Sequence, residues 1–205
     1  MAIATRLSGQ DRRSMILKEA IRLFSEKGFR GVTTRELAAS IGVSEPVLYQ
    51  HFPNKKDLYT AILEASKDEY YVEALERLRA LGEGADDEAF FRHLAESMIE
   101  WHQQKPELVR LKMFSSMEGH EQMQEFHDKQ AKPFLEVIVG YIEKRQREGA
   151  FAAVDPLTAA FVFAGAIANY CQSTIVFRSP LCAGIGQVEM VNLSVGLFLN
   201  GIRKG

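Results

Sequence analysis

Cysteine is scarce in this sequence: a chain of 205 residues contains only Cys171 and Cys182. Neither has a histidine or another cysteine at metal-ligand spacing, and no disulfide framework is indicated, so both are expected to be reduced thiols. The first residues, MAIATRLSGQDRR, lack an apolar core of signal-peptide length, which predicts a cytoplasmic location. The longest weakly polar stretch, 156–176, carries several polar side chains and is expected to be a buried helix rather than a membrane span.

Sequence motifs of catalysis are also missing. The chain has no glycine-rich phosphate-binding loop, and Ser115-Ser116 lacks an evident base and orienting acid. His120, Gln124 and His127 would share one helical face, but their spacing is not HExxH and acidic neighbours are common on solvated helices. We therefore expect a protein that is not an enzyme and that uses neither a metal nor another cofactor.

Strand-type alternation of polar and apolar residues is equally hard to find, whereas helical periodicity with caps and stops runs through the chain. Thr33-x-x-Glu36 is a capping-box pattern, Ser44 precedes a proline in a first turn, and Asn54 is a good N-cap. These signals predict an all-α protein of about nine helices. Their expected ranges are 11–27, 33–42, 44–52, 54–81, 87–103, 106–119, 120–148, 156–178 and 188–203.

The second and third of these helices are short and are joined by a tight turn at Gly42, which is the helix-turn-helix pattern. The apolar residues that can pack inward are Leu37, Ala38, Ile41, Val43, Leu48 and Phe52. The polar residues left outside are Thr34, Arg35, Ser44, Glu45, Tyr49, Gln50 and His51. In such a motif the second helix enters the major groove of DNA. A small helical core with incidental polar residues remains the alternative interpretation.

Charge is divided unevenly along the chain, with a basic N-terminal part and an acidic remainder. Residues 1–65 carry ten Lys and Arg against seven Asp and Glu, a balance of +3. Residues 66–205 carry fifteen against twenty, a balance of −5, and the two add to the net charge of −2. A basic N-terminal part on an acidic remainder favours a polyanionic partner for the N-terminal part, although the asymmetry alone is weak.

The run from residue 12 to 63, with TTRELA, IGVS, LYQHF and NKKDLY in that order, resembles the DNA-binding head of the TetR family of bacterial transcriptional regulators. Leu48-Tyr49-x-His51-Phe52 followed by Asn54-Lys55 carries most of the match, and Glu45-Pro46 departs from it, since many members have small residues there. The resemblance implies a helix-turn-helix domain over 1–53. It also implies a helical ligand-binding and dimerisation domain over 54–205, whose first helix acts as the connector.

The resemblance also implies roles for individual residues. Tyr49 and His51 would reach phosphates or base edges, and Thr34 and Ser44 would bind phosphates. Arg35 could contact guanine, and Glu45 could accept a hydrogen bond from the amino group of a cytosine. The predicted DNA-binding residues are Thr34, Arg35, Ser44, Glu45, Pro46, Val47, Tyr49, Gln50, His51 and Lys55. The alternatives are a core aromatic for Tyr49 and a solvated helix start for Lys55.

One head reads only one half-site, so binding to a palindromic operator calls for a homodimer, expected here through the last two helices. Two stripes suit this role, Phe161, Gly165, Ala168, Gln172 and Ile175 on one helix and Val191, Val195, Phe198 and Ile202 on the other. The alternative is that both stripes pack inside one subunit.

The larger domain is also rich in aromatic and methionine side chains with a few polar groups, which is typical of small-molecule pockets and equally of helical cores. The predicted ligand-binding residues are Trp101, His102, Met113, Phe114, Met117, Phe126, Phe134, Tyr141, Phe163, Ile167, Tyr170 and Thr174. Together these features predict a repressor that is released from its operator by an apolar or aromatic effector. An activator with the same head, and a helical small-molecule-binding protein or enzyme with a structural head, are the alternatives.

Overall fold

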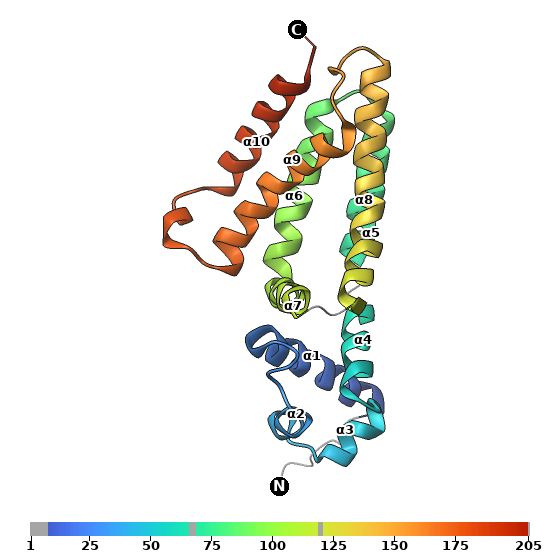
Figure 1. Ribbon diagram of the computed structural model, residues 1–205, viewed down its shortest axis with the longest axis vertical. Coiled ribbons are helices and arrows are strands. Elements are labelled where there is room, and N and C mark those ends of the chain that lie inside the picture. The colour runs from blue at the N-terminus through green and yellow to red at the C-terminus, as the bar shows by residue number, and fades with distance from the viewer. Residues whose placement is uncertain (1–7, 66–68, 119–120, 205) are drawn as a thin grey trace. The chain divides into compact units, whose positions relative to one another are not determined.

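The computed structural model describes residues 8–65, 69–118 and 121–204, with the backbone alone at 69, 121–127 and 130. These residues form helices and no β-strand, apart from an isolated antiparallel bridge between Phe151 and Arg203, which confirms the all-α prediction (Figure 1). The α-helices are α1 (Gly9–Lys27), α2 (Thr34–Ile41), α3 (Glu45–His51), α4 (Lys55–Ala65), α5 (Glu69–Glu83), α6 (Asp87–Gln104), α7 (Pro106–Met117), α8 (Glu121–Arg147), α9 (Pro156–Cys171) and α10 (Gln187–Ile202). A π-helical turn, η1 (Gln172–Val176), continues α9, and a 3₁₀ turn, η2 (Pro180–Cys182), follows it.

The chain divides into two compact units. The head unit consists of Met1–Lys67 and Glu107–Phe126, and the body unit of Asp68–Pro106 and His127–Gly205. The head unit therefore contains α4 and nearly all of α7 besides the predicted 1–53 domain. The helix expected over 54–81 is described as α4 in the head unit and α5 in the body unit, which is why the described chain has ten α-helices rather than about nine.

Short polar side chains set the helix starts of the head unit. Ser8 caps α1, exchanging hydrogen bonds with Asp11, so this helix begins earlier than the apolar periodicity predicted. The Thr33 hydroxyl accepts from the N–H of Glu36 at 3.1 Å, as expected, while the Glu36 carboxylate pairs with Lys27. Hydrogen bonding from Lys27 lowers the pKa of Glu36. The Asn54 side chain accepts from the N–H of Asp57 at 2.8 Å, which confirms it as the cap of α4.

The core of the head unit combines residues from α1 to α4 with Leu108 and Leu111 of α7. At the end of α7, the Glu118 carboxylate accepts a hydrogen bond from the backbone N–H of Arg30 at 3.3 Å. Gly28, with a φ of 72°, lies so close that a Cβ there would be 2.7 Å from a Glu118 carboxylate oxygen. The segment between α1 and α2 is thus held against α7 by packing and by hydrogen bonds.

The core of the body unit is an aromatic cluster among α6, α8, α9 and α10. Phe163 lies 4.9 Å from Phe91 and 5.1 Å from Phe198 between ring centroids, and Phe90 stacks on Tyr141 at 3.9 Å. The two Phe163 pairs, at separations usual for aromatic pairs, contribute about 0.5–1.5 kcal/mol each beyond the burial of their area. This cluster fixes α9 and α10 against α6.

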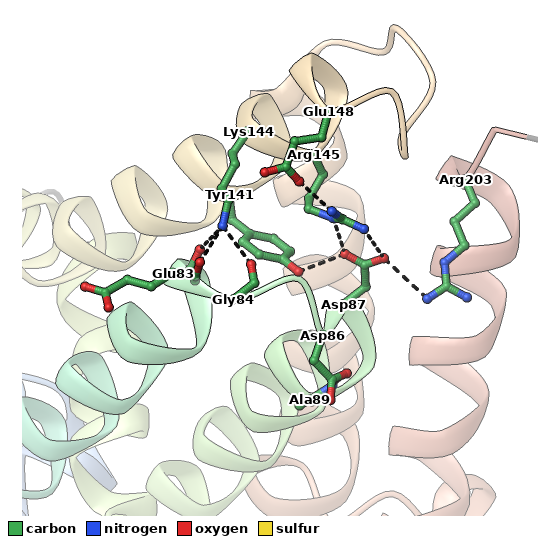
Figure 2. A network of polar contacts seen from close by, with 11 residues as sticks. Glu83, Gly84, Asp86, Asp87, Ala89, Tyr141, Lys144, Arg145, Glu148 and Arg203 are labelled. Carbon is green, nitrogen blue, oxygen red and sulfur yellow. Dashed lines mark hydrogen bonds and ion pairs between the residues drawn. The ribbon is translucent and has the colours of Figure 1, made fainter.

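A buried carboxylate joins three helices at one end of the body unit (Figure 2). Asp87 is 4% exposed and accepts hydrogen bonds from the Tyr141 hydroxyl at 2.8 Å and from Arg145 Nε at 2.7 Å, and it pairs with Arg203 at 3.4 Å. Lys144, next along α8, donates to the three successive carbonyls of 82–84. No pattern in the sequence predicts this network, because its members are far apart in the chain.

The residues that α10 buries and exposes differ from the prediction, whereas those of α9 agree with it more closely. On α10, Val191, Val195 and Ile202 are buried in the core of the body unit, so this stripe packs inside the subunit and its assignment to a dimer contact was wrong. The exposed apolar residues of α10 are Val188, Leu193 and Leu197. On α9 the stripe is accessible, and Phe161 and its neighbour Val162 are each 64% exposed.

In the described chain, one helical segment, Pro156–Val176, is long and apolar enough to cross a membrane by length and composition alone. Only 22% of its apolar 18-residue window is buried, which differs from the expectation of a buried helix. An apolar helix that remains exposed in one chain is typical of a protein interface.

Candidate nucleic-acid interface

Helices α2 and α3 are joined as the sequence predicted. Gly42 ends α2 in the left-handed conformation, with φ 76° and ψ 30°, and the N–H of Val43 donates to the carbonyl of Ala38 at 3.0 Å. Ser44 is the N-cap residue of α3 and Pro46 lies in its first turn. The inward residues Leu37, Ala38, Leu48 and Phe52 are buried, with Ile41 and Val43 half-buried against them, and the helix-turn-helix is confirmed.

The predicted DNA-binding residues are all exposed or half-buried. Arg35, Ser44, Pro46, Tyr49 and Gln50 are exposed. Thr34, Glu45, Val47, His51 and Lys55 are half-buried. Within the described chain no hydrogen bond or ion pair involves the side chain of Arg35 or of Gln50, so their donors are accessible to another molecule.

Three of these side chains form a hydrogen-bonded chain from α2 to α3. The Tyr49 hydroxyl donates to Thr34 Oγ1 at 3.2 Å, and the Thr34 hydroxyl donates to Glu45 Oε2 at 3.1 Å. Each contact spans the turn between the two helices. This arrangement fixes the Glu45 carboxylate in the first turn of α3, where the sequence departs from the resemblance.

Lys55 occupies a different environment from the surface position expected of it. Its ammonium group donates to the carbonyl of Phe29 and lies 4.2 Å from the centroid of the Phe29 ring and 5.6 Å from that of Phe24. Desolvation lowers the pKa of Lys55, and the negative charge of Glu118 partly opposes that change. Next to it in the fold, burial raises the pKa of Tyr59 to about 12.

Arg13 on α1 was missed by sequence reasoning. Its guanidinium donates to the carbonyl of His51 at 3.0 Å and lies 4.2 Å from the centroid of the Phe52 ring. The orphan carbonyls at the end of α3 are thus partly satisfied by a cation on another helix. The only signal in the sequence was an arginine near the start of the first helix, and that signal does not identify its partner.

The predicted ligand-binding residues do not form one group. Tyr141, Phe163 and Ile167 are buried in the core of the body unit, and the Tyr141 hydroxyl is already bonded to Asp87. The pKa of Tyr141 is raised by burial and by this carboxylate. The residues of the body unit that are half-buried are Trp101, His102, Phe134, Tyr170 and Thr174.

Four of the remaining predicted residues belong to the head unit. Met113 and Phe114 are half-buried on α7, and Met117 is 76% exposed. The side chain of Phe126 lies outside the described residues, as do those of His120 and His127, which were weighed as metal ligands. Among the side chains that are described, no group of three or more His, Cys, Asp and Glu residues could hold a metal ion.

Known proteins resemble this chain at two levels, one over the helix-turn-helix alone and one over most of its length. The sequence pattern of the bacterial regulatory proteins of the tetR family matches residues 16–62, which span the helix-turn-helix. The nucleoid occlusion factor SlmA of Escherichia coli O1:K1 is 30% identical over 182 residues, covering 82% of this chain and 87% of SlmA.

Two solved structures share the fold across both units. AibR, in complex with isovaleryl coenzyme A and operator DNA, has a TM-score of 0.71 at 21% identity and covers 91% of this chain and 97% of its own. The regulator FadR of Bacillus subtilis, in complex with stearoyl-CoA, has a TM-score of 0.67 at 15% identity and covers 92% of this chain and 98% of its own. With 30% identity to SlmA over most of both chains and the family pattern on its helix-turn-helix, the chain belongs to the TetR family of bacterial regulatory proteins.

Proposed function

We propose that this protein is a cytoplasmic transcriptional regulator that binds a palindromic DNA operator as a homodimer and responds to a small apolar effector. The proposal rests on the accessible polar face of α2 and α3. The apolar residues of these two helices are packed in the core of the head unit. A head that served only as structure would not need accessible Arg35 and Gln50 donors on this face. AibR, which shares the fold, binds operator DNA.

Accessible donors on this face would make the DNA contacts. The Arg35 guanidinium can bind a guanine through its O6 and N7 atoms, and the Gln50 amide can bind an adenine. Ser44 forms no side-chain cap bond with α3, so its hydroxyl is available to a phosphate. His51 lies beside them on α3. Lys55 acts differently, holding the segment after α1 against α4 from within the head.

The accessible apolar faces of α9 and α10 would form the dimer contact. Phe161 and Val162 on α9, and Leu193 and Leu197 on α10, are all more than half exposed in the single chain. Burying such a face against a second copy would form a four-helix bundle with a two-fold axis. Two heads would then be presented to half-sites about 34–36 Å apart, or a multiple of that distance.

The effector would bind in the body unit, near half-buried aromatic side chains that have polar neighbours. Trp101 lies against His102 with ring centroids 5.2 Å apart, and Phe134 lies against Tyr71 at 5.0 Å. AibR and FadR, which share the fold, hold acyl-CoA molecules, in which an apolar acyl chain is joined to a charged nucleotide, so only the acyl part supports an apolar effector. An uncharged apolar or aromatic effector fits these side chains better than a nucleotide or a sugar phosphate, because an unpaired buried phosphate is very costly.

Release of DNA would follow if the effector preferred one arrangement of the chain over another. The backbone passes between the head unit and the body unit at three places, after Lys67, Pro106 and Phe126. A change in the body unit can therefore reach the head both through α4 and through α7. Repression relieved by the effector is the sign of regulation that we propose.

A role in nucleoid occlusion is the second candidate, and the identity to SlmA over 82% of the chain favours it. DNA binding by itself does not separate the two candidates. Genome-wide occupancy combined with transcript levels in a deletion strain would do so. Sites upstream of genes whose transcripts change indicate transcriptional control, and occupied sites without transcript changes indicate the other role.

Selection of bound duplexes from a random pool, followed by a gel shift, tests the proposed function. We expect enrichment of a palindrome, and a weaker shift when an apolar compound that stabilises the protein in a thermal-shift screen is added. Enrichment without any palindrome would contradict binding as a two-fold dimer. Stabilisation by phosphorylated sugars or nucleotides, with none from apolar compounds, would contradict the proposed effector class.

A further inference from the structure

The hydrogen-bonded chain from Tyr49 through Thr34 to Glu45 uses the hydroxyl protons of both Tyr49 and Thr34. The Tyr49 hydroxyl has one proton, which it donates to Thr34, and the Thr34 hydroxyl has one proton, which it donates to Glu45 Oε2. Neither hydroxyl therefore has a donor left for a phosphate oxygen while this chain is intact. The next residue, Pro46, has no N–H to offer.

This hydrogen-bonded chain ends at Glu45, which offers a hydrogen-bond acceptor to another molecule. The carboxylate of Glu45 can accept several hydrogen bonds, and no hydrogen bond within the described chain involves its second oxygen, Oε1. A carboxylate repels phosphates, so contact with the DNA backbone is unfavourable here. The base edges of the major groove do offer hydrogen-bond donors, which are the amino groups of cytosine and adenine.

Cytosine fits this acceptor better than adenine. In the major groove cytosine presents its N4 amino group alone, whereas adenine presents the acceptor N7 beside its N6 amino group. A carboxylate placed between an amino donor and N7 would meet an unfavourable acceptor-to-acceptor contact. Glutamate accepting from cytosine N4 is accordingly a pairing that protein–DNA interfaces use.

We propose that Glu45 determines the base read by α3, with its free oxygen accepting a hydrogen bond from the N4 amino group of a cytosine in each half-site. Thr34 and Tyr49 are positioning residues that hold this carboxylate in place. The inference rests on the proposed function, because it assigns a role within the same DNA-binding face. The cytosine contact matches the sequence-based expectation for Glu45, whereas the positioning role of Thr34 differs from the phosphate contact that the resemblance implies for it.

The test compares selections from one random duplex pool at one salt concentration. Wild-type protein should enrich a cytosine at a fixed position in each half-site and discriminate against the other bases by roughly 5- to 150-fold. Glu45→Gln should shift the preference toward adenine, since an amide can bond N6 and N7 together. Glu45→Ala should remove the preference at that position alone. Glu64→Gln, an exposed carboxylate on α4, is the matched control and should enrich the wild-type site.

Thr34→Val tests the positioning role, because it keeps the shape of the side chain and removes the hydroxyl. We expect weaker discrimination at the cytosine position with little loss of affinity for duplexes that lack the cytosine. A uniform loss of affinity with the preference retained would show a phosphate contact instead, and would overturn the positioning role. Circular dichroism confirms folding, and the near-isosteric Glu45→Gln keeps the test decisive if Glu45→Ala unfolds.

Failure of this inference is distinguishable from failure of the proposed function. If wild-type protein enriches no sequence, the proposed function fails. If wild-type protein enriches a site and both Glu45 variants enrich the same site with the same base preferences, the proposed function stands and the role of Glu45 is refuted.

Discussion

Replacing Lys55 with alanine should destabilise the protein, although a lysine at a helix start is usually a solvated side chain. The ammonium group of Lys55 contacts the Phe29 carbonyl and the rings of Phe29 and Phe24. A hydrogen bond to a charged group contributes about 1.5–3 kcal/mol, and a cation–π contact about 0.5–1 kcal/mol. Relief of the desolvation that lowers the pKa of Lys55 offsets part of this sum, which leaves an expected loss of about 1–2 kcal/mol.

Chemical denaturation of Lys55→Ala beside Lys56→Ala measures the effect at equal protein concentration. Lys56 is the exposed neighbour, and its replacement should change the free energy of unfolding by no more than about 0.5 kcal/mol. For a domain of this size the Lys55 loss corresponds to a melting temperature lower by roughly 2–8 °C.

The pH dependence has a definite sign. Because the folded pKa of Lys55 lies below its ordinary value of 10.5, the unfolded chain binds more protons between the lowered value and 10.5. The stability of the wild type relative to Lys55→Ala should therefore rise with pH across that window.

Salt dependence of DNA binding separates this role from a phosphate contact. If Lys55 is internal, its replacement leaves the slope of log affinity against log salt unchanged. If Lys55 contacts a phosphate, its replacement makes that slope shallower by about 0.9. Equal stability of the two alanine variants, together with a shallower salt slope for Lys55→Ala, would refute the internal role.

Two further predictions concern the body unit. Asp87→Asn should lower the free energy of unfolding by about 3 kcal/mol, because a buried anion that accepts from Tyr141 and Arg145 is removed while the cation stays, and a denaturation midpoint close to that of the wild type would contradict this. Phe161→Glu should give monomers in light scattering with lower affinity for the selected operator, since charge is placed on the exposed apolar face of α9, and persistent dimers would move the interface elsewhere.

Local signals predicted the head well. The caps at Thr33 and Asn54 and the glycine at 42 act within a few residues of one another, and each forms the expected bond or conformation. Helical periodicity likewise separated the buried side of α2 and α3 from the accessible side. Such features depend on neighbours in sequence, which is why one sequence is enough to find them.

Contacts between distant segments were beyond sequence reasoning. The bonds of Asp87 span 54 to 116 residues, and that of Lys55 to Phe29 spans 26. The stripe containing Val191 and Val195 is apolar whether it meets a core or a second chain, so its periodicity could not decide between them. The same ambiguity affects the predicted ligand-binding residues, of which Phe163 belongs to the core.

The central claim, specific DNA binding by a two-fold dimer, is tested most directly by equilibrium titration of the selected palindrome and a scrambled duplex at one salt concentration, with the bound mass measured. We predict two chains per palindromic duplex, and an affinity for it about a thousandfold or more above that for the scrambled duplex. Equal affinity for both duplexes would contradict the claim.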